Sequence, residues 1–197
     1  ILKFQPDSVE ILQLLADTYL RKGDIDLAHD TLKKAAYVAP ENLKVQLQLA
    51  HFNLKSKNFQ EALEQVNTLL LKSPSDLSAL ILKSEILAAQ GNINATRPVI
   101  QKMKKIAPDN AQGWFRMGRL YKLQKKYSLA RKEFETAFNK APDSIDLLAE
   151  LTDFDIMLKN FKRAKERLES IVKKQPSHPS ANKFIAMINL AEKSYPK

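Results

Sequence analysis

Six prolines divide this chain at a constant interval of 34 residues. They are Pro6, Pro40, Pro74, Pro108, Pro142 and Pro176. Because proline cannot continue a helix interior, each of them marks the end of a helical stretch. A period of this length is typical of repeated two-helix units, each too small to bury its apolar face alone. The period therefore predicts an all-α chain of stacked antiparallel helix pairs.

The clearest repeat ends at the fifth of these prolines. Its signature residues are Trp114, Gly118, Tyr121, Ala130, Phe134 and Pro142. The first three have the i, i+4, i+7 spacing of one helix face, and the next two have i, i+4 spacing on a second helix. We interpret these residues as structural: they hold two amphipathic helices face to face. Gly118 and Ala130 are expected where the two backbones come close.

This spacing resembles the tetratricopeptide repeat, whose pattern is W-x2-L-G-x2-Y, then A-x3-F, then P. The resemblance implies a right-handed superhelical solenoid with a concave groove. The expected segments are 1–8 as the end of a preceding repeat, repeats 9–42, 43–76, 77–110, 111–144 and 145–178, and a closing helix with a tail over 179–197. The third repeat diverges, because Pro98 predicts a kinked or delayed second helix that starts near Asn94 or Thr96. Polar residues after the prolines are expected to cap the first helices: Asp7, Asn42, Asp76, Asp109 or Asn110, and Asp143.

The resemblance also implies that the first helix of each repeat lines the groove. Its groove positions are the second, fifth, ninth and twelfth, roughly 130° from the packing stripe. The candidate partner-binding residues at these positions are Gln13, Asp17, Leu20, Leu47, His51, Leu54, Ile81, Glu85, Phe115, Arg119, Lys122 and Asp153. An apolar seam through Leu47, Ile81 and Phe115 with flanking charges predicts a groove for a peptide or a helix. The alternative is that these side chains only pack against the neighbouring first helix.

Two specialised uses of the family are excluded by residue type. The groove lacks the Lys and Asn clamp that holds a terminal carboxylate, since the fifth and ninth positions are Gln13 and Asp17 in the first repeat. The sixth position carries Leu14, Gln48, Leu82, Arg116 and Glu150 rather than an asparagine ladder. The general function that remains is a protein–protein interaction scaffold, whose partner is a protein or a peptide.

Basic residues outnumber acidic ones, 32 to 22, which gives a net charge of +10. The excess is concentrated in the third and fourth repeats, between residues 77 and 144. One interpretation is attraction to an acidic partner there, and a basic solenoid that binds an anionic polymer or nucleic acid is the alternative function. The other interpretation is an ordinary solvated helix surface.

No catalytic or metal-binding motif is present in the sequence. There is no cysteine, and His29, His51 and His178 are far apart. We therefore expect no enzyme, no cofactor and no metal, and the apolar runs are too short to span a bilayer. No signal peptide is visible in the sequence. The start at Ile1 suggests that the chain is a piece of a longer protein. The strict proline period resembles that of long bacterial repeat proteins, including lipoproteins of envelope or exopolysaccharide-export systems. Both the periplasm and the cytoplasm remain open as compartments, and so does self-association.

Overall fold

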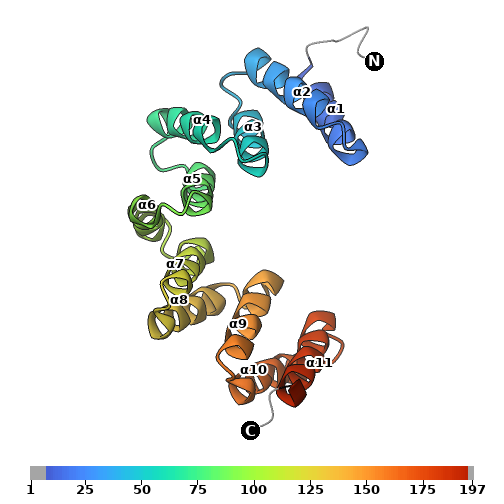
Figure 1. Cartoon of the computed structure of the whole chain (residues 1–197), viewed down its shortest axis with the longest axis vertical. Coiled ribbons are helices and arrows are strands. Elements are labelled where there is room, and N and C mark those ends of the chain that lie inside the picture. The colour runs from blue at the N-terminus through green and yellow to red at the C-terminus, as the bar shows by residue number, and fades with distance from the viewer. Residues whose placement is uncertain (1–7, 195–197) are drawn as a thin grey trace. The chain divides into compact units, whose positions relative to one another are not determined.

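The computed structural model describes residues 8–194, and every regular element in that part of the chain is an α-helix (Figure 1). The first helices of the pairs are α1 (Val9–Lys22), α3 (Leu43–Lys55), α5 (Leu77–Ala89), α7 (Ala111–Leu123) and α9 (Ile145–Met157). The second helices are α2 (Ile25–Val38), α4 (Phe59–Lys72), α6 (Ile93–Ile106), α8 (Tyr127–Lys140) and α10 (Phe161–Lys174). They are followed by α11 (Pro179–Ser194). The predicted all-α fold is confirmed. The expectation that residues 1–8 end a preceding repeat falls outside the described residues except at Ser8, and the predicted cap Asp7 lies outside them as well.

Each first helix begins one residue after a polar cap. The cap stands two positions beyond the proline, and its side-chain oxygen accepts a hydrogen bond from a backbone N–H of the first turn, as Asp76 Oδ1 does from Ala79 N at 2.8 Å. Asn42, Asp76 and Asn110 are caps, as predicted. The prediction of Asp143 is wrong, because Ser144 occupies the capping position.

The cap of α1 also affects a neighbouring carboxyl group. Ser8 Oγ accepts from Ile11 N, and the Ser8 hydroxyl donates to Glu10 Oε2 at 3.1 Å. The pKa of Glu10 is lowered, first by a hydrogen bond from its own backbone N–H and second by the bond from Ser8. An ionised Glu10 in the first turn also suits the positive end of the helix dipole.

The turns between the two helices of a pair share one backbone conformation. The residue at the turn has a positive φ in every pair, and these residues are Gly23 (85°), Lys57 (62°), Gly91 (71°), Lys125 (57°) and Lys159 (57°). The left-handed region is strained for residues with a Cβ atom, so the three lysines adopt a conformation that glycine adopts more easily. Successive turns are 34 residues apart, so the period extends to the backbone angles.

We predicted a kinked or a delayed second helix at Pro98, and the delayed start is wrong. Helix α6 begins at Ile93, because Asn92 Oδ1 accepts from Ala95 N at 3.1 Å and fixes the helix start. Pro98 lies inside the helix and cannot donate to the carbonyl of Asn94. Asn94 and Pro98 are both exposed, so water can solvate the carbonyl that Pro98 leaves without a helical donor.

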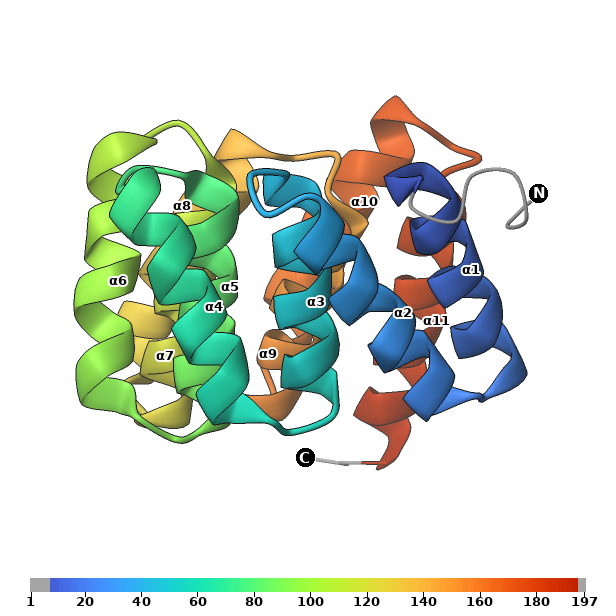
Figure 2. The same cartoon turned by 90° about the horizontal axis from the view of Figure 1, so that it is seen from above.

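The chain divides into two compact units, Ile1–Ala107 (unit 1) and Pro108–Lys197 (unit 2). In unit 1, α1 and α2 lie side by side in both views of the molecule (Figures 1 and 2). Leu12 and Ala16 of α1, Leu32 of α2 and Leu49 of α3 belong to one core cluster. A second cluster joins α3, α4 and α5 through residues such as Val66 and Ile86. In addition, the first helices α3 and α5 pack directly against each other.

The core of unit 2 is built around Phe134 of α8. Its ring is fully buried, 5.4 Å from the ring of Phe154 and 6.0 Å from the ring of Phe115. A Cβ atom added at Gly118 would lie 2.5 Å from Phe134 Cδ1. Gly118 is therefore the point of close approach between α7 and α8, although the approaching group is the aromatic ring rather than the backbone of α8.

A buried carboxylate joins three helices of unit 2. Asp155 of α9 is fully buried, and its two oxygens each lie 2.6 Å from a guanidinium nitrogen, one of Arg131 in α8 and one of Arg167 in α10. Both arginine side chains are mostly buried. Since a buried charge is tolerated only with partners, this triad ties α8, α9 and α10 together.

Candidate functional site

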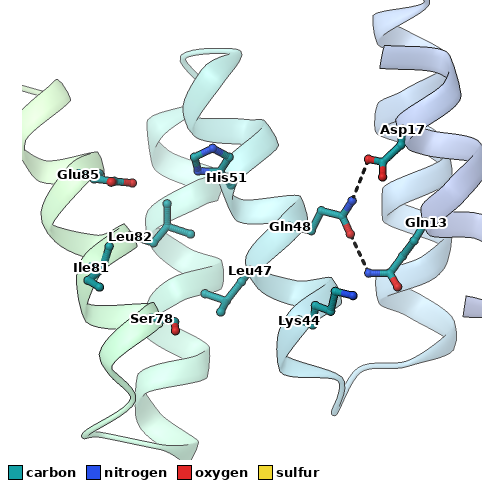
Figure 3. A pocket seen from close by; sticks show the side chains of 10 residues that line it. All are labelled: Gln13, Asp17, Lys44, Leu47, Gln48, His51, Ser78, Ile81, Leu82 and Glu85. Carbon is teal, nitrogen blue, oxygen red and sulfur yellow. Dashed lines mark hydrogen bonds between the residues drawn. The ribbon is translucent and has the colours of Figure 1, made fainter. Parts of the chain in front are cut away.

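A cleft of about 540 Å³ opens along the first helices of unit 1 (Figure 3). Its lining comes from α1, α3 and α5 and comprises Gln13, Asp17, Lys44, Leu47, Gln48, His51, Ser78, Ile81, Leu82 and Glu85. Six of these were predicted partner-binding residues, namely Gln13, Asp17, Leu47, His51, Ile81 and Glu85, and Lys44 and Ser78 also occupy predicted groove positions. They meet because each first helix begins directly after a capping residue at the same point of the repeat, so equal positions on neighbouring helices face the same way.

The floor of the cleft is apolar. Leu47 comes from α3, and Ile81 and Leu82 come from α5. Leu82 is buried, and Leu47 packs against the second core cluster. Ile81 is half-buried and lines the cleft, so part of its side chain is available to a ligand.

A chain of hydrogen bonds forms one wall of the cleft. Gln13 Nε2 of α1 donates to Gln48 Oε1 of α3 at 2.8 Å, and Gln48 Nε2 donates to Asp17 Oδ1 of α1 at 3.3 Å. The dashed lines in Figure 3 mark both bonds. Because the chain crosses between two helices, it restricts the rotamers of all three side chains and positions the Asp17 carboxylate.

The two edges of the cleft differ in charge. Asp17, His51 and Glu85 form a row along one edge of the cleft, one from each helix, with His51 in the middle, whereas Lys44 and Ser78 lie toward the other edge (Figure 3). The apolar floor lies between them. Such a site can hold an aliphatic side chain and orient it through polar groups at the rim.

The remaining predicted groove residues do not line this cleft. Leu20 is 38% exposed, and Leu54 packs against the second core cluster of unit 1. In unit 2, Phe115 packs against the core around Phe134, and Asp153 is exposed. Phe115 therefore contributes to the core of its own unit.

The predicted basic groove residues of unit 2 are paired within the chain. Lys122 Nζ lies 2.7 Å from Glu150 Oε1, and Arg119 Nε lies 3.8 Å from Glu150 Oε2. The Arg119 guanidinium also lies 5.7 Å from the centre of the Phe115 ring. Glu150 on α9 thus neutralises part of the positive charge of α7, which reduces the attraction of this face for an anion.

The signature residues of the fourth pair differ in burial. Ala130 and Phe134 are fully buried and Gly118 is buried, but Trp114 and Tyr121 are only half-buried and Pro142 is exposed. The indole N–H of Trp114 donates to the Pro108 carbonyl at 2.9 Å, and Lys140 Nζ lies 5.6 Å from the centre of its ring. Trp114 therefore links the first turn of α7 to the preceding loop and contacts Lys140 of α8. As a half-buried residue, it contributes less buried area than a fully buried core tryptophan would.

Sequence reasoning missed two kinds of residue. Gln48 and Leu82 line the cleft from the sixth position, which the groove pattern omitted. The Asp155 triad also went unpredicted, although its signal is visible in the sequence: Asp155 occupies the position of Tyr121 one repeat later, where a core residue is expected.

Within residues 8–194, no group of three His, Asp or Glu side chains could hold a metal ion. No helix in that same range combines the length and the apolar character that crossing a bilayer requires.

Family models match most of the chain. A model described as "Psidin, N-terminal TPR repeats region" matches residues 46–181, and a tetratricopeptide repeat model matches residues 9–42. The two matches follow one another along the chain, and together they cover most of both compact units.

Three curated proteins are similar in sequence to this chain. Protein O-mannosyl-transferase TMTC1 of Mus musculus is 25% identical over 83% of this chain and 18% of its own length. BBSome complex member BBS4 of Bos taurus is 23% identical over 83% of this chain and 31% of its own length. Anaphase-promoting complex subunit 3 of Schizosaccharomyces pombe is 26% identical over 64% of this chain and 19% of its own length. The chain thus spans less than a third of each of these relatives.

Solved structures with the same fold include TTC0263, a thermophilic TPR protein of Thermus thermophilus, with a TM-score of 0.73 and 18% identity over 93% of this chain and 100% of that chain. The type IV pilus biogenesis factor PilW has a TM-score of 0.70 and 17% identity over 92% of this chain and 84% of that chain. Proteins of this fold are typically non-enzymatic scaffolds, although one relative is named as a transferase. The general function of the chain is protein–protein interaction, and by the match over 46–181 the chain belongs to the tetratricopeptide repeat family.

Proposed function

We propose that the cleft of unit 1 binds a peptide or a helix of a partner protein, and that the chain acts as a scaffold within a larger assembly. The observation that carries this proposal is the convergence of Leu47, Ile81 and Leu82 on one open floor with polar groups at both edges. Stability of the solenoid alone does not require an apolar residue such as Ile81 at a half-buried position on this face.

The expected affinity comes mainly from one or two apolar anchors. Full burial of a Leu or Ile side chain contributes about 1.5–3 kcal/mol, and polar groups at the rim mainly set register and specificity. Dissociation constants in the micromolar range, about −8 kcal/mol, are therefore reasonable for a short peptide after the entropic cost of ordering it.

The alternative function, binding of an anionic polymer or nucleic acid, has less support from the site. Arg119 and Lys122 are paired with Glu150, and Arg131 is taken up by the buried Asp155. Lys125 and Lys126 at the turn after α7 remain exposed, so the double variant Lys125→Glu, Lys126→Glu tests this function. Polymer binding would weaken steeply as salt rises, whereas binding to the apolar cleft would change little.

The cleft can be tested with a library of random peptides displayed on phage and selected on the immobilised chain. Peptides selected on the wild-type chain should bind the Ile81→Ser variant at least about tenfold more weakly. This corresponds to a loss of about 1.4 kcal/mol in binding free energy. The matched control is Leu71→Ser, which removes an 82% exposed aliphatic residue of the same unit that does not line the cleft. Equal binding to both variants would show that the selected peptides bind elsewhere.

A further inference from the structure

We propose that the cleft of unit 1 selects peptides that carry a lysine or arginine beside an aliphatic anchor. This inference rests on the proposed function and names the chemistry of the partner. It follows from the charges at the site, which oppose the charge of the chain as a whole.

The chain has a net charge of +10, yet the cleft lining carries two carboxylates, Asp17 and Glu85, and a single ammonium group, Lys44. His51 is the only other titratable group in the lining. Long-range attraction by the basic chain would bring in acidic segments, but the oriented Asp17 carboxylate favours a cationic group at its side of the cleft. Local charges dominate at contact distance, because salt screens the rest of the chain beyond about 8–10 Å.

The two carboxylates lie along the same edge of the cleft, on its two opposite sides. Asp17 on α1 and Glu85 on α5 hold equivalent positions in their helices, on either side of His51 on α3 (Figure 3). A cationic side chain next to an aliphatic anchor on Leu47 would therefore meet the Asp17 carboxylate on the α1 side of the cleft. Lys44 toward the other edge disfavours a second cation there and gives the peptide a direction.

The Asp17 carboxylate is preorganised for this contact. Gln48 donates to Oδ1 of Asp17 and is itself fixed by Gln13, so the carboxylate is oriented before a ligand arrives. A carboxylate can accept several hydrogen bonds, which leaves Oδ2 able to accept from an ammonium or guanidinium group. Orientation in advance lowers the entropic cost of forming the new pair.

The span of the cleft sets the length of the peptide. Packed helix axes are about 8–10 Å apart, so the distance from α1 across α3 to α5 is roughly 20 Å. An extended chain rises about 3.3 Å per residue and covers this distance in about six residues. An anchor over the floor and a cation one or two residues away both fit within this length.

The test uses the full chain and three capped, fluorescein-labelled peptides of about eight residues, long enough to span the floor. All three contain two leucines in a serine and glycine background, with lysine, glutamine or glutamate beside the leucines. Fluorescence anisotropy at low salt should rank the lysine peptide about fivefold tighter than the glutamine peptide, with the glutamate peptide weakest, as expected for a partly exposed ion pair. Salt near 1 M should remove the difference.

Variants separate the charge preference from binding itself. Asp17→Asn should remove most of the advantage of the lysine peptide and leave the glutamine peptide unchanged. The matched control is Asp153→Asn, which makes the same change of charge on an exposed residue of unit 2 and should alter neither peptide. Equal affinities for the lysine and glutamine peptides would overturn the charge preference while leaving cleft binding intact. Affinities for all three peptides that survive Ile81→Ser would overturn the proposed function and, with it, this inference.

Discussion

Substitution of Gly118 by alanine tests the packing on which unit 2 depends. The new methyl group would lie 2.5 Å from Cδ1 and 2.6 Å from Cε1 of the Phe134 ring, well inside van der Waals contact. The ring has little room to withdraw, because it is fully buried between Phe154 and Phe115. Relief therefore requires a shift of α7 away from α8 or a strained rotamer of Phe134.

Two opposing terms set the magnitude. Alanine is favoured over glycine in a helix interior by about 1 kcal/mol. Overpacking of a filled core costs about 1–3 kcal/mol. The Phe134 ring is confined by its neighbours, so we expect a cost at the upper end of that range. We expect a net loss of about 2 kcal/mol in the free energy of unfolding of unit 2.

The chain provides a suitable probe for this measurement. Its one tryptophan, Trp114, lies in the same helix as Gly118 and is bonded to the Pro108 carbonyl at the start of that helix. Urea unfolding followed by tryptophan fluorescence therefore reports on unit 2 without assuming that the two units unfold together. Far-UV circular dichroism records the helices of both units in the same experiment.

A double-mutant cycle distinguishes the steric cause from a general effect. In a Phe134→Leu background the ring carbons are removed, so Gly118→Ala should cost much less or even stabilise the helix, with a coupling energy of about 1–2 kcal/mol. A stabilising effect of Gly118→Ala in the wild-type chain, or a coupling energy near zero, would refute the argument from close approach.

Three further predictions concern the buried triad, the turns and Pro98. Asp155→Ala should destabilise unit 2 by about 3–5 kcal/mol, because it leaves Arg131 and Arg167 without their carboxylate. The control Asp153→Ala, at an exposed position, should change stability by less than about 0.5 kcal/mol. Both changes are measured by urea unfolding followed through Trp114 fluorescence. Lys125→Gly should stabilise the chain by about 1 kcal/mol because φ is 57° there, and Lys126→Gly, where φ is −86°, should bring no such gain in thermal unfolding. Pro98→Ala should stabilise unit 1 by up to about 3 kcal/mol through a new bond to the Asn94 carbonyl, and an unchanged urea midpoint by circular dichroism would contradict this.

The positions of the helices followed from local signals. The prolines, the caps Asn42, Asp76 and Asn110, and the turn residues each act on backbone groups within about four positions along the chain. Pro98 shows the limit of such rules. Proline disfavours a helix interior, but the Asn92 cap fixes the start of α6, and Asn94 and Pro98 are both exposed residues. Propensity was overridden there because the missing hydrogen bond lies between exposed residues.

The candidate site was predictable only in part. The register of the first helices placed Leu47 and Ile81 on one face, since equal positions in equal helices point the same way. It could not show that Gln48 would join Gln13 to Asp17, or that Glu150 would neutralise Arg119 and Lys122. These contacts join residues about 30 positions apart, and they depend on the separation of two helices and on the rotamers of long side chains.

The sequence by itself determined the repeated helix pairs, their caps and their turns, because the interactions responsible are hydrogen bonds and backbone preferences within a few residues. Only the tertiary structure decided which charges are free and which are paired. The repeat places Asp155 at a core position, but only the structure shows that two arginines from neighbouring helices pair with this buried carboxylate, while Asp17 lines an open cleft. Burial of a charge depends on whether cations from neighbouring helices arrive at the same point, and packing across the repeats, rather than any local pattern, brings them there.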